Sequence, residues 1–255
     1  MRAVRRAERL GAILDELSEG GAVDVAALSR RLGASAATIR RDLVLLDTQR
    51  LLTRTHGGAV AHGVAYELPL RYKAGRHQDE KRRIAAHAAS RVSEGMAIGL
   101  TGGTTTTEVS RAIVEVDRLT VVTNALNIAS ELAIRRNLKL VVTGGWARSE
   151  SYELVGPLAE ATLAGLQLDL ACVGVDGISA RTGLTTHHEA EAHTNLTLME
   201  HARRVIVVAD GSKVGNAAFA RIASVDRVNE LITDGSADPA ALEEIRDAGV
   251  EVTIV

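Results

Sequence analysis

A run of small and basic residues near the N-terminus has the chemistry to read a nucleic acid. It is Ser35-Ala36-Ala37-Thr38-Ile39-Arg40-Arg41-Asp42-Leu43. If Ile39 and Leu43 face inward on a helix, the two alanines and two arginines fall on its outer face. Arginine forks bind base edges and phosphates, and small side chains let a helix lie deep in the major groove. The alternative is that these residues form the solvent-exposed basic face of a helix bundle that binds no nucleic acid.

A second group, Thr101-Gly102-Gly103-Thr104-Thr105-Thr106, has the composition of an anion-binding loop. It lies between an expected strand and an expected helix. Its glycines would let the backbone approach a ligand, while N–H groups and hydroxyls at the helix N-terminus point towards an anion. No Gly-Lys-Ser/Thr ends the loop and it is not G-x-G-x-x-G, so nucleotide binding loses its best support. An ordinary strand-to-helix turn is the alternative.

Two charged residues follow other expected strands. Lys213 could neutralise a phosphate or carboxylate, and Asp176 could accept a hydrogen bond from a ligand hydroxyl. The ligands of such sheets bind beyond the carboxyl ends of the strands, where both residues would lie. An exposed loop lysine and a simple Asp-Gly turn are the respective alternatives.

The histidine-rich segment His187-His188-Glu189-x-Glu191-x-His193 invites a metal interpretation. A zincin needs histidines four residues apart with Glu after the first, whereas the spacing here is five. We therefore predict no metal site, and favour an entrance loop and helix cap in which Glu189 and Glu191 face the pocket. Cys172, in an apolar strand, is interpreted as a buried small hydrophobe.

Three helices and a hairpin are expected to position the first group. The expected helices are the stretch carrying Leu10, Ile13, Leu14 and Leu17 before Gly20-Gly21, then 25–32 between the cap Asp24 and Gly33, then 36–48 after the cap Ser35. Residues 51–60 form two short extended runs around Gly57-Gly58, a pair that can take positive φ. This pattern predicts a winged helix-turn-helix.

Beyond residue 78 the pattern changes to alternating strands and helices. The expected strands are 96–100, 119–123, 138–143, 170–175, 205–209, 230–233 and 250–255. The expected helices are 105–114, 127–136, 157–166, 189–203 and 239–248. Strands that are apolar on both faces and separated by helices predict a mostly parallel sheet covered on both sides, which is an α/β fold.

Composition excludes several classes of protein. The chain has 255 residues, 46% of them hydrophobic, and one cysteine, so a disordered chain and a disulfide framework are ruled out. Only 2% are aromatic, which argues against base-stacking readers of single strands. Residues 1–60 carry ten arginines against seven acids, whereas the remainder carries 20 cations against 25 anions. We see no membrane span or signal peptide and expect a cytoplasmic protein.

The N-terminal residues resemble the DeoR family of bacterial transcription regulators. In that family S-x-x-T-I-R-R-D-L is followed by L-x-R-x-H-G-G-A, which residues 35–43 and 52–59 match. The rest of the chain resembles the family's effector domain at Glu80-Lys81, the Gly99–Thr107 loop, Val122-Thr123-Asn124, Gly144-Gly145, Gly174-x-Asp176-Gly177 and Asp210-x-Ser212-Lys213.

The resemblance implies a winged helix-turn-helix followed by a larger α/β effector domain of isomerase-like fold, similar to ribose-5-phosphate isomerase. We expect domains at 1–60 and 78–255 with a linker at 61–77. The expected DNA contacts are Ser35, Ala36, Ala37, Thr38, Arg40, Arg41, Arg54, His56 and Gly57. The expected effector contacts are Thr101, Gly102, Gly103, Thr104, Thr105, Thr106, Asn124, Gly145, Asp176, Glu189 and Lys213.

The function implied is a DNA-binding regulator, a repressor of sugar-metabolism genes whose effector is a phosphorylated sugar. Its partners would be double-stranded operator DNA, that metabolite, and further copies of the chain in a dimer or tetramer. No membrane partner, cofactor or catalysis is expected. The alternative is an enzyme of the sugar-phosphate isomerase type with an N-terminal helical appendage, in which Asp176 would act as base and Lys213 would anchor phosphate.

Overall fold

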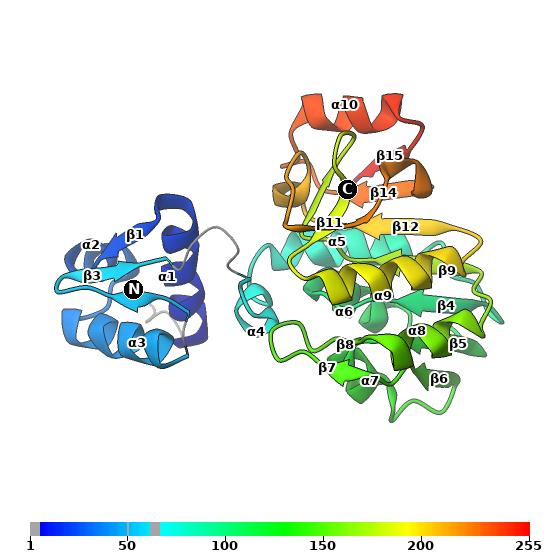
Figure 1. The fold of residues 1–255 in the computed structure, drawn as a ribbon, viewed down its shortest axis with the longest axis horizontal. Helices are drawn as coiled ribbons and strands as arrows, with labels where there is room; N and C mark the ends of the chain where they lie inside the picture. Colours follow the sequence, from blue (N-terminus) through cyan, green and yellow to red (C-terminus); the bar gives the residue numbers. More distant parts are fainter. Residues whose placement is uncertain (1–5, 50, 62–66) are drawn as a thin grey trace. The chain divides into compact units, whose positions relative to one another are not determined.

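The computed structural model describes residues 6–49, 51–61 and 67–255. The chain divides into two compact units, residues 1–76 and 77–255, called here the N-terminal and C-terminal units. Each is described by itself (Figure 1).

The N-terminal unit is built from helices around a small antiparallel sheet. Its helices are α1 (Arg6–Gly20), α2 (Val25–Leu32), α3 (Ala36–Thr48) and α4 (Leu70–Lys73). Its strands are β1 (Ala22–Asp24), β2 (Thr53–Arg54) and β3 (Gly58–Val60), in the order β1-β3-β2. Leu10, Ile13, Leu28, Ile39 and Leu43 belong to its buried core. The three expected helices and the wing hairpin are confirmed.

The helix caps are also as the sequence predicts. The Asp24 carboxylate accepts hydrogen bonds from the N–H groups of Ala26 and Ala27 at 2.9 Å each. Ser35 Oγ accepts from the N–H of Thr38 at 3.2 Å. Gly33 ends α2 in the left-handed region, with φ of 60°. Both helices of the helix-turn-helix therefore begin at residues suited to an N-cap, and α2 also ends at a residue suited to a C-cap.

The expectation of positive φ at the Gly57-Gly58 pair is wrong, because neither glycine adopts it. Gly58 is required for space instead. β3 pairs with β1 through Gly58 and Asp24, and a Cβ on Gly58 would lie 1.8 Å from the carbonyl oxygen of Val23. The missing side chain lets the wing pack against β1, a strand that the sequence analysis did not predict.

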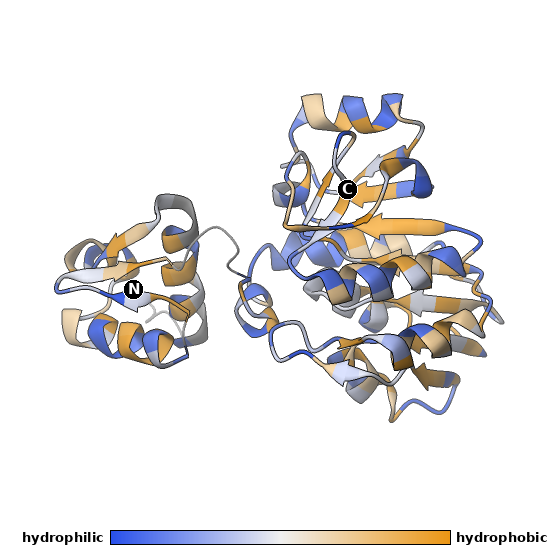
Figure 2. Cartoon of the chain, viewed as in Figure 1, coloured by the Kyte–Doolittle hydropathy of each residue, from blue (hydrophilic) through white to orange (hydrophobic). Residues whose placement is uncertain are grey.

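The C-terminal unit is organised around a seven-stranded sheet in the order β15-β14-β12-β9-β4-β5-β6. The strands are β4 (Ala97–Leu100), β5 (Leu119–Thr123), β6 (Leu138–Val142), β9 (Leu170–Val173), β12 (Val205–Val208), β14 (Glu230–Thr233) and β15 (Glu251–Ile254). All neighbours in it are parallel. The strands are largely apolar (Figure 2). All seven expected strands and the α/β fold class are confirmed.

Helices cover both faces of this sheet. They are α5 (Gln78–Ala89), α6 (Thr104–Ala112), α7 (Leu126–Leu132), α8 (Pro157–Ala164), α9 (Glu189–Glu200) and α10 (Pro239–Asp247). Side chains of α5, α6 and α7 share one core with Ile206 and Val208 of β12. Side chains of α8, α9 and α10 share the other core with Val205 and Val207. The alternation along one strand shows that each face of the sheet is buried.

Several short elements were not predicted. An antiparallel sheet in the order β10-β11-β13 comprises β10 (Gly177–Ser179), β11 (Gly183–Thr186) and β13 (Ala220–Ala223). A hairpin pairs β7 (Trp146–Ala147) with β8 (Leu154–Val155), and two 3₁₀ turns lie at η1 (Gly211–Lys213) and η2 (Val225–Arg227). In the expected linker, α4 contacts α1, and Tyr72 joins the N-terminal core. Among the described residues, no helix is long and apolar enough to cross a membrane.

Candidate functional site

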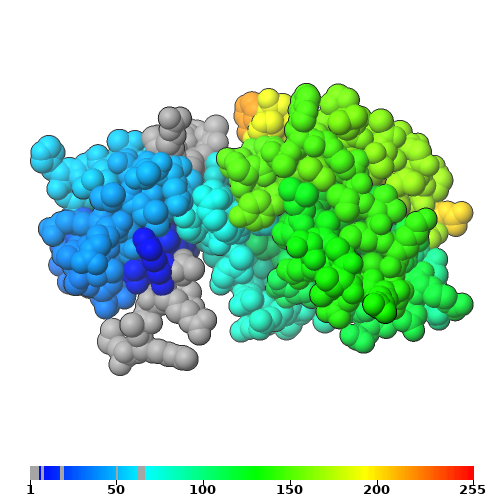
Figure 3. All heavy atoms as spheres, turned by 90° about the horizontal axis from the view of Figure 1, so that it is seen from below, coloured from blue at the N-terminus to red at the C-terminus, as the bar shows by residue number. Residues whose placement is uncertain are grey.

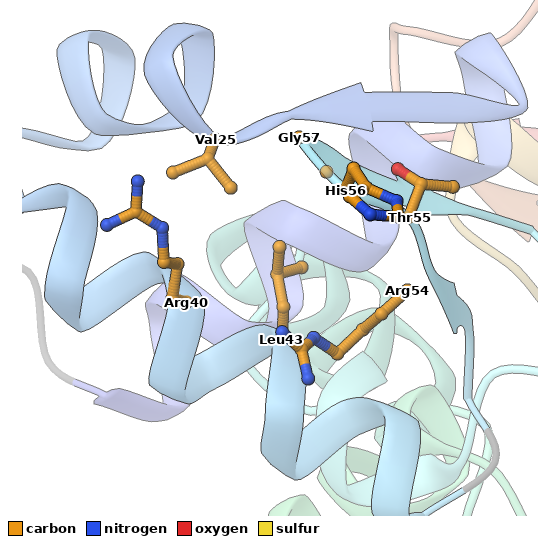
Figure 4. A pocket seen from close by; sticks show the side chains of 8 residues that line it. Val25, Arg40, Leu43, Arg54, Thr55, His56 and Gly57 are labelled. Atoms are coloured by element: carbon orange, nitrogen blue, oxygen red, sulfur yellow. The ribbon is translucent and has the colours of Figure 1, made fainter.

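A shallow pocket in the N-terminal unit lies between α3 and the wing. Its lining consists of Val25, Arg40, Leu43, Arg54, Thr55, His56, Gly57 and Gly58. Figure 4 shows Arg40 projecting from α3 and Arg54 from the wing, with Val25 and Leu43 between them. No lining residue is acidic, so the pocket presents cationic and hydrogen-bonding groups from two elements. The structure thus brings together the expected DNA-contacting residues Arg40, Arg54, His56 and Gly57.

Arginines of the N-terminal unit fall into two classes. Arg9 donates to both oxygens of the buried Asp42 carboxylate, at 2.5 and 3.3 Å, and so joins α1 to α3. Arg31 pairs with Glu16 at 2.7 Å. By contrast, Arg40 and Arg41 are exposed, and within the described residues neither they nor Arg54 pairs with an acid. Among the described arginines, Arg9 therefore holds the fold, whereas Arg40, Arg41 and Arg54 face solvent.

The small and hydroxyl residues at the start of α3 differ in their availability. Ala37 is exposed and Ala36 is half-buried, so neither adds bulk to the start of the helix. The hydroxyls of Ser35 and Thr38 lie 2.9 Å apart and bind each other. Their first role is to cap α3, and only their remaining hydrogen-bonding capacity faces outward.

In the C-terminal unit, the Thr101–Thr106 loop follows β4 at the carboxyl edge of the sheet. Thr101 is fully buried, and its Oγ1 accepts a hydrogen bond from the N–H of Gly174 at 2.9 Å. This bond ties the loop to the end of the neighbouring strand β9. The expected effector residue Thr101 therefore lies beneath the loop surface, as a support for it.

The first turn of α6 has the form of an anion-binding N-terminus. Thr106 and Thr107 both turn their hydroxyls to the carbonyl oxygen of Gly103, at 3.0 and 2.7 Å. Gly103 has a φ of 128°, which suits glycine. The N–H groups at the start of a helix lack partners within the helix. Since the hydroxyl bonds occupy only a carbonyl, the backbone N–H groups of residues 104–106 are the donors that this loop offers.

Asp176, after β9, lies at the centre of a charged cluster. Its carboxylate is 3.8 Å from Lys213 Nζ and 3.9 Å from His187 Nε2, and it accepts a hydrogen bond from Thr186 at 3.2 Å. The structure thus joins two expected effector residues that are distant in sequence, and adds His187 and Thr186. In this state Lys213 is already paired with a carboxylate.

A second ion pair continues this cluster. Thr186 Oγ1 also lies 3.0 Å from Glu191, so its single hydroxyl proton is shared between the two carboxylates, and Arg148 donates to the other oxygen of Glu191. Glu191 is buried, whereas Glu189 is exposed at the first position of α9. The acidic residue that faces the cluster is therefore Glu191 and not Glu189. Arg148 was missed because nothing in its local sequence marks it.

A buried acid, Glu153, lies against the loop. It accepts a hydrogen bond from Asn124 Nδ2 at 3.0 Å, and a Cβ on Gly102 would lie 2.4 Å from its Cγ. Burial raises the pKa of the Glu153 carboxyl well above its usual value, and the charges of Glu191 and Asp176 add to the effect. A neutral carboxyl can donate a hydrogen bond as well as accept one.

The side chain of Asn124 leaves one hydrogen-bond acceptor of this polar cluster unsatisfied. Its Nδ2 also donates to Asn195 at 3.3 Å, which fixes the orientation of the amide. Its Oδ1 is buried and has no hydrogen-bond partner among the residues that the structure describes. An unsatisfied acceptor in a buried polar cluster costs free energy, about 1–3 kcal/mol, unless a donor from outside the chain fills it.

Two other features are structural. Gly145 leaves room for β8, since a Cβ there would lie 2.6 Å from the carbonyl oxygen of Val155. The Asp234 carboxylate, after β14, accepts from the N–H groups of Gly211 and Ser236 at 2.7 and 2.9 Å. The bond to Gly211 fixes the turn that carries Lys213. Sequence reasoning missed Asp234, although an acid directly after a buried strand is a signal that could have found it.

The histidines do not form a common site. His188 Nδ1 caps α9 by accepting from the N–H of Ala190 at 3.1 Å, while His193 lies 3.5 Å from Glu160. Among the described residues, no three His, Cys, Asp or Glu side chains are arranged to hold a metal ion. Burial raises the pKa of the Cys172 thiol to about 12, so this residue is not an activated nucleophile.

Comparison with known proteins agrees with this two-part arrangement. Residues 9–63 match the DeoR-like helix-turn-helix domain, and residues 76–235 match the DeoR C terminal sensor domain. The chain is 38% identical to the HTH-type transcriptional regulator GlpR of Haloferax volcanii, over 96% of each protein. It is 27% identical to the glycerol-3-phosphate regulon repressor of Escherichia coli K12, over 98% of this chain and 100% of the repressor.

Among solved structures, ribose 5-phosphate isomerase A of Methanocaldococcus jannaschii is similar at 21% identity and a TM-score of 0.40. The similarity covers 54% of each chain.

Proposed function

Because the chain belongs to the DeoR family of transcriptional regulators, we propose that it represses sugar-metabolism genes under control of a phosphorylated sugar. Residues 1–60 would bind double-stranded operator DNA, residues 61–77 would connect, and residues 78–255 would bind the effector and assemble the oligomer. We propose that the protein acts in the cytoplasm, where the operator DNA of a prokaryotic cell lies.

The observation that carries the DNA-binding part is the unpaired charge of Arg40, Arg41 and Arg54. An exposed arginine without an acidic partner contributes little to folding, but it can neutralise a phosphate or bind a guanine edge. Arg40 comes from α3 and Arg54 from the wing, and both line one pocket. The remaining proposed contacts are Ser35, Ala36, Ala37, Thr38, Arg41, His56 and Gly57.

Three features support an anionic effector: the helix N-terminus at Gly103–Thr106, Lys213, and the similarity to the glycerol-3-phosphate regulon repressor. Lys213 and Arg148 are paired with Asp176 and Glu191. A phosphate would therefore compete with these carboxylates for the cations. We propose that Lys213 changes partner when the effector binds, and that Asp176, Asn124 and Glu191 then hold its hydroxyl groups.

We propose no catalysis. Asp176, the base of the rival isomerase mechanism, is occupied by Lys213, His187 and Thr186. Incubation with a panel of pentose and hexose phosphates tests this point. A sensor should bind one of them without converting it, and turnover would favour the enzyme.

Operator binding tests the DNA-contacting residues. Arg40→Ala and Arg41→Ala should each weaken binding by about 1–3 kcal/mol, without a change in melting temperature. Arg181→Ala, which removes an exposed arginine of the C-terminal unit, is the matched control and should bind normally. Wild-type affinity in both α3 variants would remove this helix from the proposed interface.

Effector response tests the other unit. Lys213→Ala and Gly103→Val should each abolish the influence of the metabolite on DNA binding while operator affinity is kept. If the metabolite still changed DNA binding normally in either variant, the effector would have to bind at another site.

A further inference from the structure

One edge of the seven-stranded sheet is open and bordered by apolar side chains. β6 is the last strand in the sheet, and within the described part of the chain it pairs only with β5. Its sequence, Leu-Lys-Leu-Val-Val, contains a single charge, Lys139. An apolar edge strand with free N–H and C=O groups is a template for pairing with another strand, and proteins normally cover or charge such edges.

Four exposed apolar side chains border this strand. They are Leu126 (41% exposed), Val142 (39%), Trp146 (69%) and Leu158 (67%), here called the β6 edge surface. Contiguous exposed apolar groups of this size mark interaction sites more often than single exposed residues do.

Contacts between the elements place these four residues on neighbouring segments. Thr162 of α8 donates a hydrogen bond to the carbonyl oxygen of Thr143, directly after β6, at 2.8 Å. A Cβ on Gly156, the cap of α8, would lie 3.3 Å from the Trp146 ring. The N–H of Leu126 binds the carbonyl oxygen of Tyr152 at 3.0 Å. Figure 3, seen from below, shows the green part of the chain, which includes β6 and α7, forming the near surface of the C-terminal unit.

The opposite edge of the sheet lacks this character. β15 begins with Glu251, whose carboxylate lies 3.3 Å from Arg204, and its exposed large apolar residue is Ile254. Each edge strand carries one charged residue. The two edges therefore differ in their exposed large apolar side chains, since β15 has one and the β6 edge surface has four.

Charge along β6 indicates which occupant fits. Arg135, Arg136 and Lys139, at the start of the strand, are exposed and have no acidic partner among the described residues. Glu150 and Glu160 lie in the segments that follow the other end of the strand, 3.8 Å from Arg148 and 3.5 Å from His193 respectively. A second β6 running antiparallel would place its basic end against this acidic end, and the reverse contact would repeat by two-fold symmetry.

We propose that the β6 edge surface binds a second copy of this chain, with the two β6 strands antiparallel and Trp146 and Leu158 buried between the copies. The proposal rests on the proposed function in one respect: a regulator whose DNA-binding domains read paired half-sites must be an oligomer. The proposal names the surface through which that oligomer forms.

The full chain tests the proposal, because Trp146 is its single tryptophan. Sedimentation should give wild-type protein at least twice the chain mass, and Leu158→Glu should halve the wild-type value. Trp146 emission should be blue-shifted and shielded from acrylamide in wild type, and should become red-shifted and accessible in Leu158→Glu. Ile254→Glu, on the opposite edge, is the matched control and should change neither quantity.

A second variant guards against misfolding. Arg135→Glu with Arg136→Glu alters only exposed cations that no acid in the described part of the chain pairs with, and should raise the concentration at which half the protein dissociates by at least tenfold. Unchanged mass in both variants, with Trp146 freely quenched in wild type, would overturn the proposal. Operator binding by the wild type is measured separately. If the wild type did not bind operator DNA, the proposed function would be contradicted. Leu158→Glu at half the wild-type mass would support this interface in either case.

Discussion

Glu153 fills the space where Gly102 would carry a side chain: a Cβ on Gly102 would lie 2.4 Å from Cγ and Oε1 of Glu153. The two residues lie 51 positions apart, yet the glycine of the proposed anion loop and a buried acid share one volume. Gly102 is thus required by its neighbour. The backbone conformation of the loop does not require it, since φ of Gly102 is not positive.

The raised pKa of Glu153 predicts a pH dependence of stability. The folded state holds the proton more tightly than the unfolded chain, whose glutamates titrate near ~4.3, so stability falls as pH rises from that value through the folded pKa. Glu153→Gln removes this loss. The variant should be more stable than wild type at pH 8, and the difference should shrink towards pH 4 in urea unfolding.

Glu150→Gln is the control for that comparison, because Glu150 lies in the same loop but is only half-buried. It should follow the wild-type profile. A Glu153→Gln profile parallel to wild type would mean that the carboxyl is ionised throughout and that burial is offset by the cations of the cluster.

The opposite behaviour is expected at Glu230, at the start of β14. Burial alone would raise its pKa, but hydrogen bonds from Arg91 and Thr253 outweigh burial and lower it. Arg91 donates at 3.1 and 2.9 Å, and Arg204 at 2.8 Å. This carboxylate joins α5 to the sheet on the edge opposite the proposed effector site.

Glu230→Gln should therefore cost about 2 kcal/mol of unfolding free energy at pH 7, because it weakens the hydrogen bonds that the partly exposed Arg91 and Arg204 donate to a buried carboxylate. The stabilisation is present above the unfolded pKa and is lost as pH falls through the folded pKa, so the two proteins should converge in acid. Urea unfolding at pH 7 and below pH 4 measures this. A constant difference at both pH values would contradict the ionic explanation.

The sequence predicts the elements better than the clusters between them. The seven sheet strands are mostly apolar runs, and Asp24 and Ser35 are strong caps, so local chemistry is sufficient to place them. The partners Arg148 and Glu191, or Gly102 and Glu153, come from segments that only tertiary packing brings together. A two-residue strand such as β7 has no periodicity to detect, and Gly58 is required by a strand that lies 34 residues earlier.

The fold of the N-terminal unit should depend on Asp42. This carboxylate is 2% exposed and is held by Arg9, whose side chain is only 12% exposed, so removing it takes a charged acceptor from a mostly buried guanidinium. Asp42→Ala should lower the stability of the unit by about 3 kcal/mol and should weaken operator binding through unfolding. Asp47→Ala, also on α3, should have little effect. Thermal unfolding of both variants decides between a structural and a DNA-contacting role for Asp42.

The last prediction concerns Asp234, which fixes the turn that carries Lys213. Burial raises the pKa of this carboxyl, but hydrogen bonds from Ser236 and from the N–H of Gly211 outweigh burial and lower it, so it is ionised at neutral pH. Both of its oxygens accept from backbone N–H groups, at 2.7 and 2.9 Å. In Asp234→Asn, one acceptor becomes an NH₂ group facing an N–H donor, so one of the two bonds is lost.

The loosened turn should weaken effector affinity about tenfold, equivalent to about 1.4 kcal/mol, while operator affinity in the absence of effector stays unchanged. Asp238→Asn is the matched control: Asp238 caps α10 through the N–H of Ala240, a position where Asn serves equally well. Calorimetric titration with the sugar phosphate that wild type binds measures the affinities. Equal affinity in Asp234→Asn and wild type would mean that the position of Lys213 does not depend on this carboxylate, and the proposed anion site would then have to be built from the Gly103–Thr106 loop alone.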